Sequence, residues 1–179
     1  MNKKDILERL EKMDMESFVT IDTPHMYQMV IVGGSGLVLL GTISRATQDI
    51  DALQASPEIR HLLEKYDANL RVSAFINNFP YNFEDRLHKL PVGGRKIIFY
   101  AASLEDIVIA KLYSDRNTDR QDIISKSVLE NIDWDRLEHL AMDDDEAKAS
   151  ALNEHRYRDF LIDYHEYVRR YGPHEKIDV

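Results

Sequence analysis

Ile31-Val32-Gly33-Gly34-Ser35-Gly36, followed shortly by Thr47-Gln48-Asp49-Ile50-Asp51-Ala52, is the stretch that decides the fold. The first segment reads as an apolar strand that ends in a glycine-rich bend. The second segment carries two acids at alternate positions. Because alternate side chains of a strand share one face, Asp49 and Asp51 are predicted to point the same way while Ile50 points into the core.

These two segments together predict a binding site. Two carboxylates on one face can hold a divalent cation, Mg²⁺ or Mn²⁺. If the bend leads into a short helix, the free backbone N–H groups around Gly33, Gly34 and Ser35 can hold phosphate oxygens opposite that cation. The sequence therefore predicts a site for a metal-bound nucleoside triphosphate.

The composition limits the classes of protein to consider. The chain has 179 residues, of which 44% are hydrophobic and 31% charged, and it contains no cysteine. This indicates one compact domain, or a core with a helical appendage, and excludes a thiolate zinc site. The N-terminal residues lack the apolar core of a signal peptide, and no apolar run approaches the roughly 20 residues of a membrane span. We therefore expect a cytoplasmic protein that is not inserted in a membrane.

The net charge bears on the partners. A formal charge of −9 argues against broad nucleic-acid binding, which needs a basic surface. A local basic pocket for one triphosphate remains compatible with this charge.

The hydrophobic periodicity divides the chain into an α/β part over residues 1–102 and a helical part over residues 103–179. In the second part, Ser103 and Asp106 resemble a capping box, Thr118 and Gln121 form another, and Asp133 is a predicted N-cap. The fold class is therefore α+β, a small mixed sheet with flanking helices and a helical C-terminal region. The predicted elements are helices over 3–14, 36–40, 57–66, 104–112, from 118, from 134 and over 145–171, and strands over 27–32, 46–53, 70–76 and 95–100.

The first motif carries a resemblance to a known superfamily. The order of strand, Gly34-Ser35 turn, short helix and Asp49-Ile50-Asp51 strand resembles the DNA polymerase beta-like nucleotidyltransferases. Arg45 and Thr47 extend this likeness, since small bacterial members commonly carry an Arg-x-Thr-x-Asp-hydrophobic-Asp run. The plain alternative is a tight turn and a solvated strand end, with Arg45 as a surface charge that balances the two acids.

A second segment, residues 103–123, is similar to the helix-break-helix of the abortive-infection toxin-like nucleotidyltransferases, and the two motifs together cover about residues 30–125. The alternatives are a Lys111 that extends to solvent and ordinary first-turn acids at Asp119 and Asp122. The residues that match the helix-break-helix are Lys111, Arg116, Asp119, Arg120 and Asp122.

The resemblance implies transfer of a nucleoside monophosphate from an NTP to a hydroxyl, with release of pyrophosphate. Asp49 and Asp51 would hold the metal, and Lys111 with Arg116 or Arg120 would supply positive charge to the phosphates. The acceptor, whether a tRNA end, a protein or a small molecule, stays open.

One departure from the superfamily qualifies this expectation. Two-metal members bring a third carboxylate from a later strand, and residues 70–78 contain no acid. Asp119 or Asp122 could substitute, the reaction could run with a weaker base, or the protein could bind nucleotide without turnover. The alternative function is a catalytically reduced nucleotide-binding module, or an interaction module of the toxin–antitoxin type with a protein partner.

Overall fold

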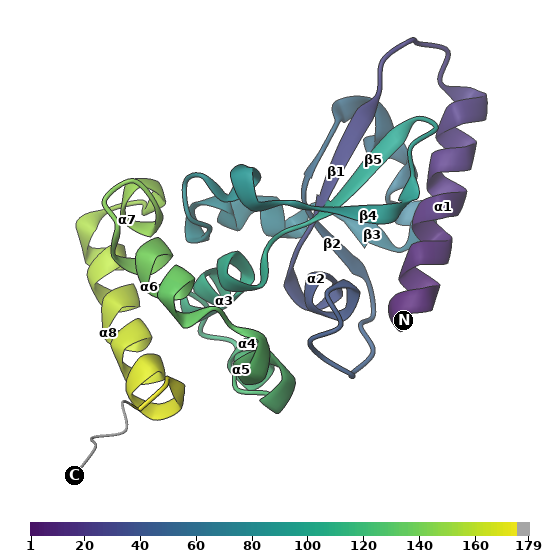
Figure 1. Ribbon diagram of the computed structural model, residues 1–179. Helices are drawn as coiled ribbons and strands as arrows, with labels where there is room; N and C mark the ends of the chain where they lie inside the picture. The colour runs from purple at the N-terminus through teal and green to yellow at the C-terminus, as the bar shows by residue number, and fades with distance from the viewer. Residues whose placement is uncertain (175–179) are drawn as a thin grey trace.

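The computed structural model describes residues 1–174, and a five-stranded mixed sheet forms its centre (Figure 1). The sheet order is β3-β2-β1-β5-β4. β1 is parallel to β5 and antiparallel to β2, whereas β3 is parallel to β2 and β4 is antiparallel to β5. This confirms the predicted α+β class. The strands are β1 (Tyr27–Ile31), β2 (Ile50–Ala55), β3 (Ala68–Asn69), β4 (His88–Gly93) and β5 (Ile97–Ala101).

Helices flank the sheet and make up the C-terminal region. The α-helices are α1 (Lys3–Thr20), α2 (Gly33–Leu39), α3 (Leu104–Leu112), α4 (Asn117–Ile123), α5 (Lys126–Asn131), α6 (Trp134–Met142), α7 (Ala147–Ser150) and α8 (Glu154–Tyr171). Short 3₁₀ helices connect the strands: η1 (Pro57–Leu62), η2 (Glu64–Tyr66), η3 (Arg71–Asn78) and η4 (Phe83–Arg86). No helix in the described part of the chain combines the length and the apolar character that crossing a membrane demands.

The centre of the sheet is covered on both faces, as β1 shows. Met29 and Ile31 belong to a hydrophobic cluster that includes residues of α1, whereas Val30 and Val32 belong to a second cluster with residues of α3, α6 and α8. Successive side chains of a strand point to opposite faces, so a continuous apolar run such as this suits a central strand covered on both sides. The second cluster joins the sheet to the helical region.

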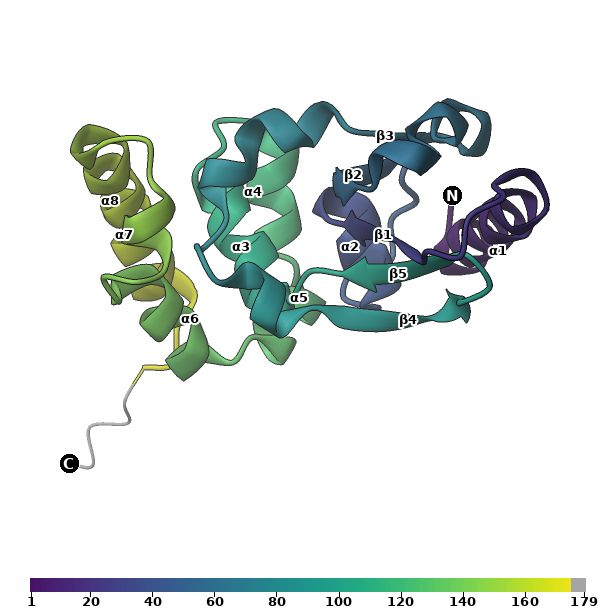
Figure 2. The same ribbon diagram turned by 90° about the horizontal axis from the view of Figure 1, so that it is seen from above.

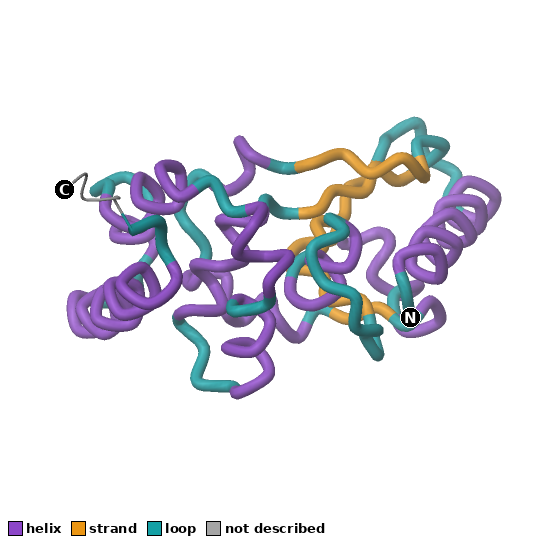
Figure 3. The backbone as a smooth tube through the Cα atoms, turned by 60° about the horizontal axis from the view of Figure 1, so that its bottom comes forward, coloured by secondary structure: helices purple, strands orange, loops and turns teal. Residues whose placement is uncertain are grey.

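The views from different sides agree on the arrangement. α1 and the sheet lie at one end, α6, α7 and α8 lie at the other, and α3 and α4 lie between them (Figures 1 and 2). Figure 3 shows the strands gathered in one half of the molecule and helices filling the other. The predicted boundary between residues 102 and 103 falls between β5 and α3. The division into two domains stays a prediction. The last five residues of the predicted helical part, 175–179, lie outside the described residues.

Local capping explains where several helices begin. The Asp106 N–H donates to the Ser103 hydroxyl at 3.2 Å at the start of α3, and the Arg136 N–H donates to Asp133 Oδ1 at 3.0 Å at the start of α6. Both caps satisfy amides that have no partner within the helix. Ser103 and Asp133 are therefore confirmed as N-caps, and the predicted break between α3 and α4 is also present. The capping box at Ser103 is only half formed, because the Asp106 carboxylate accepts from the Ser103 hydroxyl and from Arg86 instead of the Ser103 N–H.

The predicted strand over 70–76 is wrong. The residues that pair with β2 are only Ala68 and Asn69, and the chain then forms η3. Val72, Phe75 and Phe79 are spaced by three and four residues, which is a helical period, and all three line one cavity. The alternating apolar residues suggested a strand, but the structure adopts the helical spacing.

Other element predictions need smaller corrections. The helix expected over 57–66 is the pair η1 and η2, and Ser56 contacts Gln28 instead of capping it. The helix expected over 145–171 is divided into α7 and α8, because Asn153 caps a new start. The capping box at Thr118 is absent, since α4 begins at Asn117 without a side-chain cap. β4 was not predicted, and its Pro91 is tolerated because this strand lies at the sheet edge.

Candidate functional site

The glycine-rich bend joins β1 to α2 and is tied to the start of β2. Gly33 has a φ of +62°, a left-handed conformation that costs little only for glycine. The Val32 N–H donates to the Asp51 carbonyl oxygen at 2.9 Å. The Ser35 hydroxyl donates to the Val32 carbonyl oxygen at 2.9 Å and accepts from the Asp51 N–H at 3.0 Å. The buried Ser35 side chain therefore holds the bend against β2 instead of pointing to a ligand.

The two acids of the second segment lie together beside this bend. Asp51 is the second residue of β2, and Asp49 immediately precedes the strand. The Asn69 Nδ2 group donates to Asp49 Oδ2 at 3.0 Å and lies 3.5 Å from Asp51 Oδ1. Asn69 reaches both because β3 pairs with β2 in the register that places Asn69 beside Asp51. One amide thus contacts both carboxylates.

The electrostatics of the pair favour a cation. Burial, and then the negative charge of Asp49, raise the pKa of Asp51 above its usual value, although Asn69, Arg116 and Arg71 oppose part of this rise. A raised pKa means that the ionised carboxylate is held at a cost in this protein. A divalent cation would remove that cost, and carboxylate oxygens are the ligands that Mg²⁺ and Mn²⁺ prefer. The residues present therefore fit one such ion.

A third acid does not accompany the pair. Within residues 1–174, no group of three or more His, Cys, Asp or Glu side chains could hold a metal ion. The position on the neighbouring strand in register with Asp51 is occupied by Asn69, a neutral amide. The departure noted in the sequence thus persists in three dimensions.

Lys111 lies in a buried cluster of charges between α3 and α4. Its side chain is 6% exposed, and its Nζ donates to Asp119 Oδ1 and, at 3.0 Å, to Asp122 Oδ2. Burial alone would raise the pKa of both acids, but contacts with cations hold each pKa below its usual value. For Asp119 the largest of these opposing effects is the charge of Lys111. For Asp122 it is the hydrogen bond from Arg45. Lys111 therefore meets anions from its own chain.

Arg45 and Thr47 shape the segment that leads into β2. Arg45 donates from Nε to Asp122 Oδ1 at 2.7 Å and from Nη2 to Asp122 Oδ2 at 2.6 Å, a bidentate pair that joins this segment to α4. The Thr47 hydroxyl donates to the Asp49 carbonyl oxygen at 3.0 Å. Arg45 therefore joins this segment to α4, and Thr47 supports the backbone at Asp49.

Arg116 and Arg120 have different surroundings. Arg116 Nε donates to Asp119 Oδ2 at 2.8 Å, and its side chain is 73% exposed at the edge of the site. Arg120 instead donates to the Ser114 carbonyl oxygen at 3.1 Å and to Asp163 Oδ2 at 2.7 Å on α8. The structure thus brings Arg116 to the carboxylate pair and directs Arg120 to α8.

Several of these residues line a cavity of about 600 Å³. Gly33, Asp49, Asp51, Arg71 and Arg116 line it. Its lining also includes the aromatic side chains of Phe75, Phe79 and Tyr113, which we call the aromatic part of the cavity. The residues that sequence reasoning missed are Asn69, Arg71, Phe75, Asn78, Phe79, Tyr113 and Arg156. The helical spacing within η3 was the signal that could have found some of them.

The aromatic part of the cavity has one unsatisfied polar group. Tyr113 stacks on Phe160 at a centroid distance of 4.5 Å, and the Arg156 guanidinium lies 5.4 Å from the Tyr113 ring. The buried Tyr113 hydroxyl has no hydrogen-bond partner among the described residues, and burial raises its pKa to about 12. Phe75, in contrast, is 60% exposed. A planar ring can stack on such side chains.

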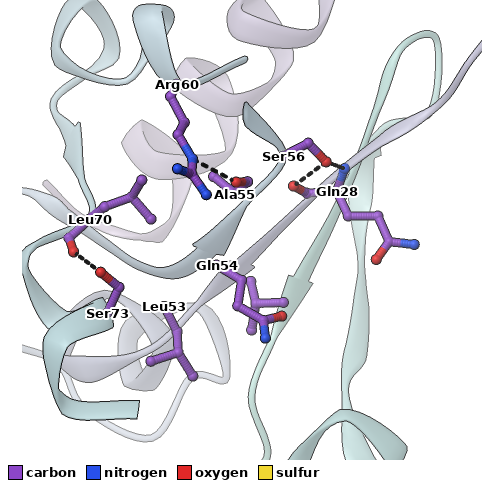
Figure 4. A pocket seen from close by; sticks show the side chains of 9 residues that line it. Gln28, Leu53, Gln54, Ala55, Ser56, Arg60, Leu70 and Ser73 are labelled. Atoms are coloured by element: carbon purple, nitrogen blue, oxygen red, sulfur yellow. Dashed lines mark hydrogen bonds between the residues drawn. The ribbon is translucent and has the colours of Figure 1, made fainter. Parts of the chain in front are cut away.

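A second cavity, of about 320 Å³, lies farther along β2 (Figure 4). Arg60 Nε donates to the Ala55 carbonyl oxygen at 3.0 Å, and the Ser73 hydroxyl donates to the Leu70 carbonyl oxygen at 2.6 Å. None of the described residues that line it carries a carboxylate. This cavity therefore lacks a group that could hold a divalent cation.

Comparison with protein families gives one result. A family model described as nucleotidyltransferase of unknown function (DUF6036) matches residues 8–172. That range includes the sheet, the glycine-rich bend, the carboxylate pair and most of the helical region. The comparisons with curated proteins and with solved structures found no match.

Proposed function

The chain belongs to this nucleotidyltransferase family, and from that premise we propose that it moves a nucleoside monophosphate from a metal-bound NTP to a hydroxyl acceptor. The observation that carries the proposal is the meeting of Asp49 and Asp51 beside the Gly33 bend, within a cavity of about 600 Å³. This volume lies in the range of small-molecule sites in proteins.

The carboxylates and the bend would divide the binding of the triphosphate. Asp49 and Asp51 would hold Mg²⁺ or Mn²⁺, which when bound neutralises charge on the phosphates during transfer. The first amides of α2, at Gly33, Gly34 and Ser35, have no acceptor within the helix and would donate to phosphate oxygens. Arg116 would add a guanidinium at the edge of the cavity.

The reaction forms one bond and breaks one. The acceptor oxygen attacks the α-phosphorus, the bond from that phosphorus to the oxygen bridging to the β-phosphate breaks, and pyrophosphate leaves with that electron pair. The acceptor proton passes to solvent water in this proposal. Asp119 also lines the cavity, but its lowered pKa makes it a weak base.

Other residues act by positioning in this proposal. Lys111 holds Asp119 and Asp122, Asp119 in turn orients Arg116, and Asp122 holds Arg45. Arg120 fastens α4 to α8 through Asp163. Thr47 supports the backbone at Asp49. The aromatic part of the cavity would receive the base.

A second candidate function rests on Asn69. With an amide beside Asp51 where a further acid would bind a second ion, the protein would bind nucleotide without turnover, or act as one half of a toxin–antitoxin type pair. The two candidates differ in one product. Only the transferase releases pyrophosphate.

The acceptor remains open among a tRNA end, a protein and a small molecule, and the charge of −9 favours the last two.

Thermal unfolding with each of the four NTPs, with and without Mg²⁺, tests the site. At a hundred times its Kd, a ligand that binds only the folded protein stabilises it by about 2.7 kcal/mol. We expect one Mg-NTP to stabilise the wild type and not the Asp49→Asn variant. Pyrophosphate release from that NTP, measured with candidate acceptors, then separates the transferase from the binding module. A stabilisation that persists in Asp49→Asn would overturn the proposed site.

A further inference from the structure

Arg71 is the cation in closest contact with the carboxylate pair. It is the first residue of η3, and its Nη2 donates to Asp49 Oδ2. The Arg71 side chain is 76% exposed, whereas that of Asp49 is 33% exposed. Among the described residues, Asp49 is the only hydrogen-bond acceptor of the Arg71 guanidinium. The Asp49 oxygen that Arg71 contacts also accepts from Asn69.

Three other cations, Lys111, Arg45 and Arg116, are held by acids outside the proposed cation site. Lys111 is buried between Asp119 and Asp122, and Arg45 forms a bidentate pair with Asp122. Arg116 is bonded to Asp119. Of these residues, only Arg71 is bonded to a carboxylate of the proposed cation site.

A divalent cation and a guanidinium compete for the same carboxylate oxygens. A cation held by Asp49 and Asp51 would therefore take the partner of Arg71 and leave an exposed guanidinium at the cavity. Guanidinium groups bind phosphate oxygens through paired hydrogen bonds. The triphosphate would be the anion next to it.

We propose that Arg71 exchanges partners during loading, holding Asp49 in the cation-free protein and binding the triphosphate once a divalent cation occupies the carboxylate pair. The proposal rests on the proposed function. Arg71 is then a substrate-binding residue that also pairs with the Asp49 carboxylate while no cation is bound.

The build of η3 allows this exchange. None of its residues is buried, and Phe75 within it departs from helical geometry with φ −108° and ψ 22°. The Arg71 side chain is itself 76% exposed, so its guanidinium can turn from Asp49 to a phosphate while η3 stays packed against the core. The exchange also couples the two ligands, since triphosphate gives the displaced guanidinium a new partner and thereby favours cation binding.

The test compares two affinities in the full-length protein and in Arg71→Gln. The first is the Kd for Mn²⁺ alone, measured from the free-ion signal in electron paramagnetic resonance. The second is the Kd for inorganic tripolyphosphate at saturating Mg²⁺, measured by calorimetry, which does not depend on the preferred base. We expect Mn²⁺ to bind Arg71→Gln more tightly, by up to about fivefold, since an exposed ion pair no longer competes. We expect tripolyphosphate to bind about tenfold more weakly or worse, because a charged donor is lost.

Arg116→Gln is the matched control. It removes the same charge from the same cavity, but from a residue bonded to Asp119 and not to Asp49. The charge of Arg116 also acts on Asp51 at least as strongly as that of Arg71. A purely long-range effect on Asp51 would therefore strengthen Mn²⁺ binding in Arg116→Gln as well as in Arg71→Gln, whereas Asp49 is bonded only to Arg71 of these two residues. Partner exchange requires the larger gain in Arg71→Gln.

The outcomes separate the two proposals. Equal Mn²⁺ affinities in the two variants, or an unchanged tripolyphosphate Kd in Arg71→Gln, would overturn the exchange while leaving the proposed function in place. If the wild type binds no Mn²⁺, or if its Mn²⁺ binding persists in Asp49→Asn, the proposed site is overturned and the exchange with it. Arg71→Lys, which keeps the charge but loses the paired donors, should retain wild-type Mn²⁺ affinity and lose part of the tripolyphosphate affinity.

Discussion

A Cβ atom built on Gly33 would lie 2.9 Å from Asp51 Oδ2, so the glycine-rich bend and the carboxylate pair are packed together without room for a side chain. The same closeness recurs one residue later, where a Cβ on Gly34 would lie 3.0 Å from Arg45 Nη2. The bend therefore lies against Asp51 at Gly33 and against the Arg45 guanidinium, which binds Asp122 of α4, at Gly34. A ligand that contacts the bend backbone must lie close to Asp51.

Gly33→Ala should weaken the cation site, and Gly41→Ala should not. Both glycines have positive φ, +62° and +74°, so each alanine should cost about 1–2 kcal/mol of stability through backbone strain. Only at Gly33 does the added methyl group meet Asp51, whereas nothing lies within 4 Å of a Cβ on Gly41. Displacing a ligand or its support typically lowers metal affinity by about 10- to 100-fold. Urea unfolding and Mn²⁺ titration of the two variants check this, and equal Mn²⁺ affinities would contradict it.

Lys111→Met should destabilise the protein strongly at neutral pH. Lys111 is 6% exposed, and its removal leaves Asp119 and Asp122 buried with too little positive charge, which costs about 3–5 kcal/mol. The folded-state pKa values of both acids are lowered, so their contribution to stability is present above the unfolded pKa of about 3.9 and is lost as pH falls through the folded values. The cost should therefore shrink on acidification.

Urea unfolding between pH 7 and pH 4 measures this cost, and Lys126→Met provides the comparison. Lys126 pairs with Glu130 on an exposed helix face, with side chains 87% and 61% exposed. Its loss should cost at most about 0.5 kcal/mol. Similar costs for the two lysine variants would show that the buried cluster contributes no more than a surface pair.

Asp51→Asn should stabilise the cation-free protein at pH 7, by up to about 1 kcal/mol, while removing cation binding. Burial, and then Asp49, raise the folded-state pKa of Asp51. A carboxyl group whose pKa is raised on folding stabilises the folded state only while it is protonated. The wild type therefore loses stability as the pH rises through the folded-state pKa of Asp51. The gap between variant and wild type should therefore open with rising pH and close below the unfolded pKa of about 3.9. Thermal unfolding from pH 4 to 8, with and without Mn²⁺, checks the sign, and a wild type more stable than the variant without metal would refute it.

Much of the fold could be predicted because its signals are local. The glycine-rich bend, the alternate acids Asp49 and Asp51, and the caps Ser103 and Asp133 each depend on residues a few positions apart. The segment at 70–76 could not be predicted in the same way, because its apolar residues satisfy both a strand pattern and a helical one. Packing against β2 and α3 chose the helical pattern.

The sequence by itself determined that a glycine-rich bend and two closely spaced acids would occur near the start of a strand, because these signals depend on residues a few positions apart, although only Asp51 of the two lies within β2. Only the tertiary structure decided what those acids meet. Asn69 and Arg71 reach the pair through the register of β3 on β2, and Lys111 is bound by Asp119 and Asp122 because α3 and α4 pack together. Such partners are distant or ambiguous in sequence, and their pairing depends on burial and on the fit of whole elements.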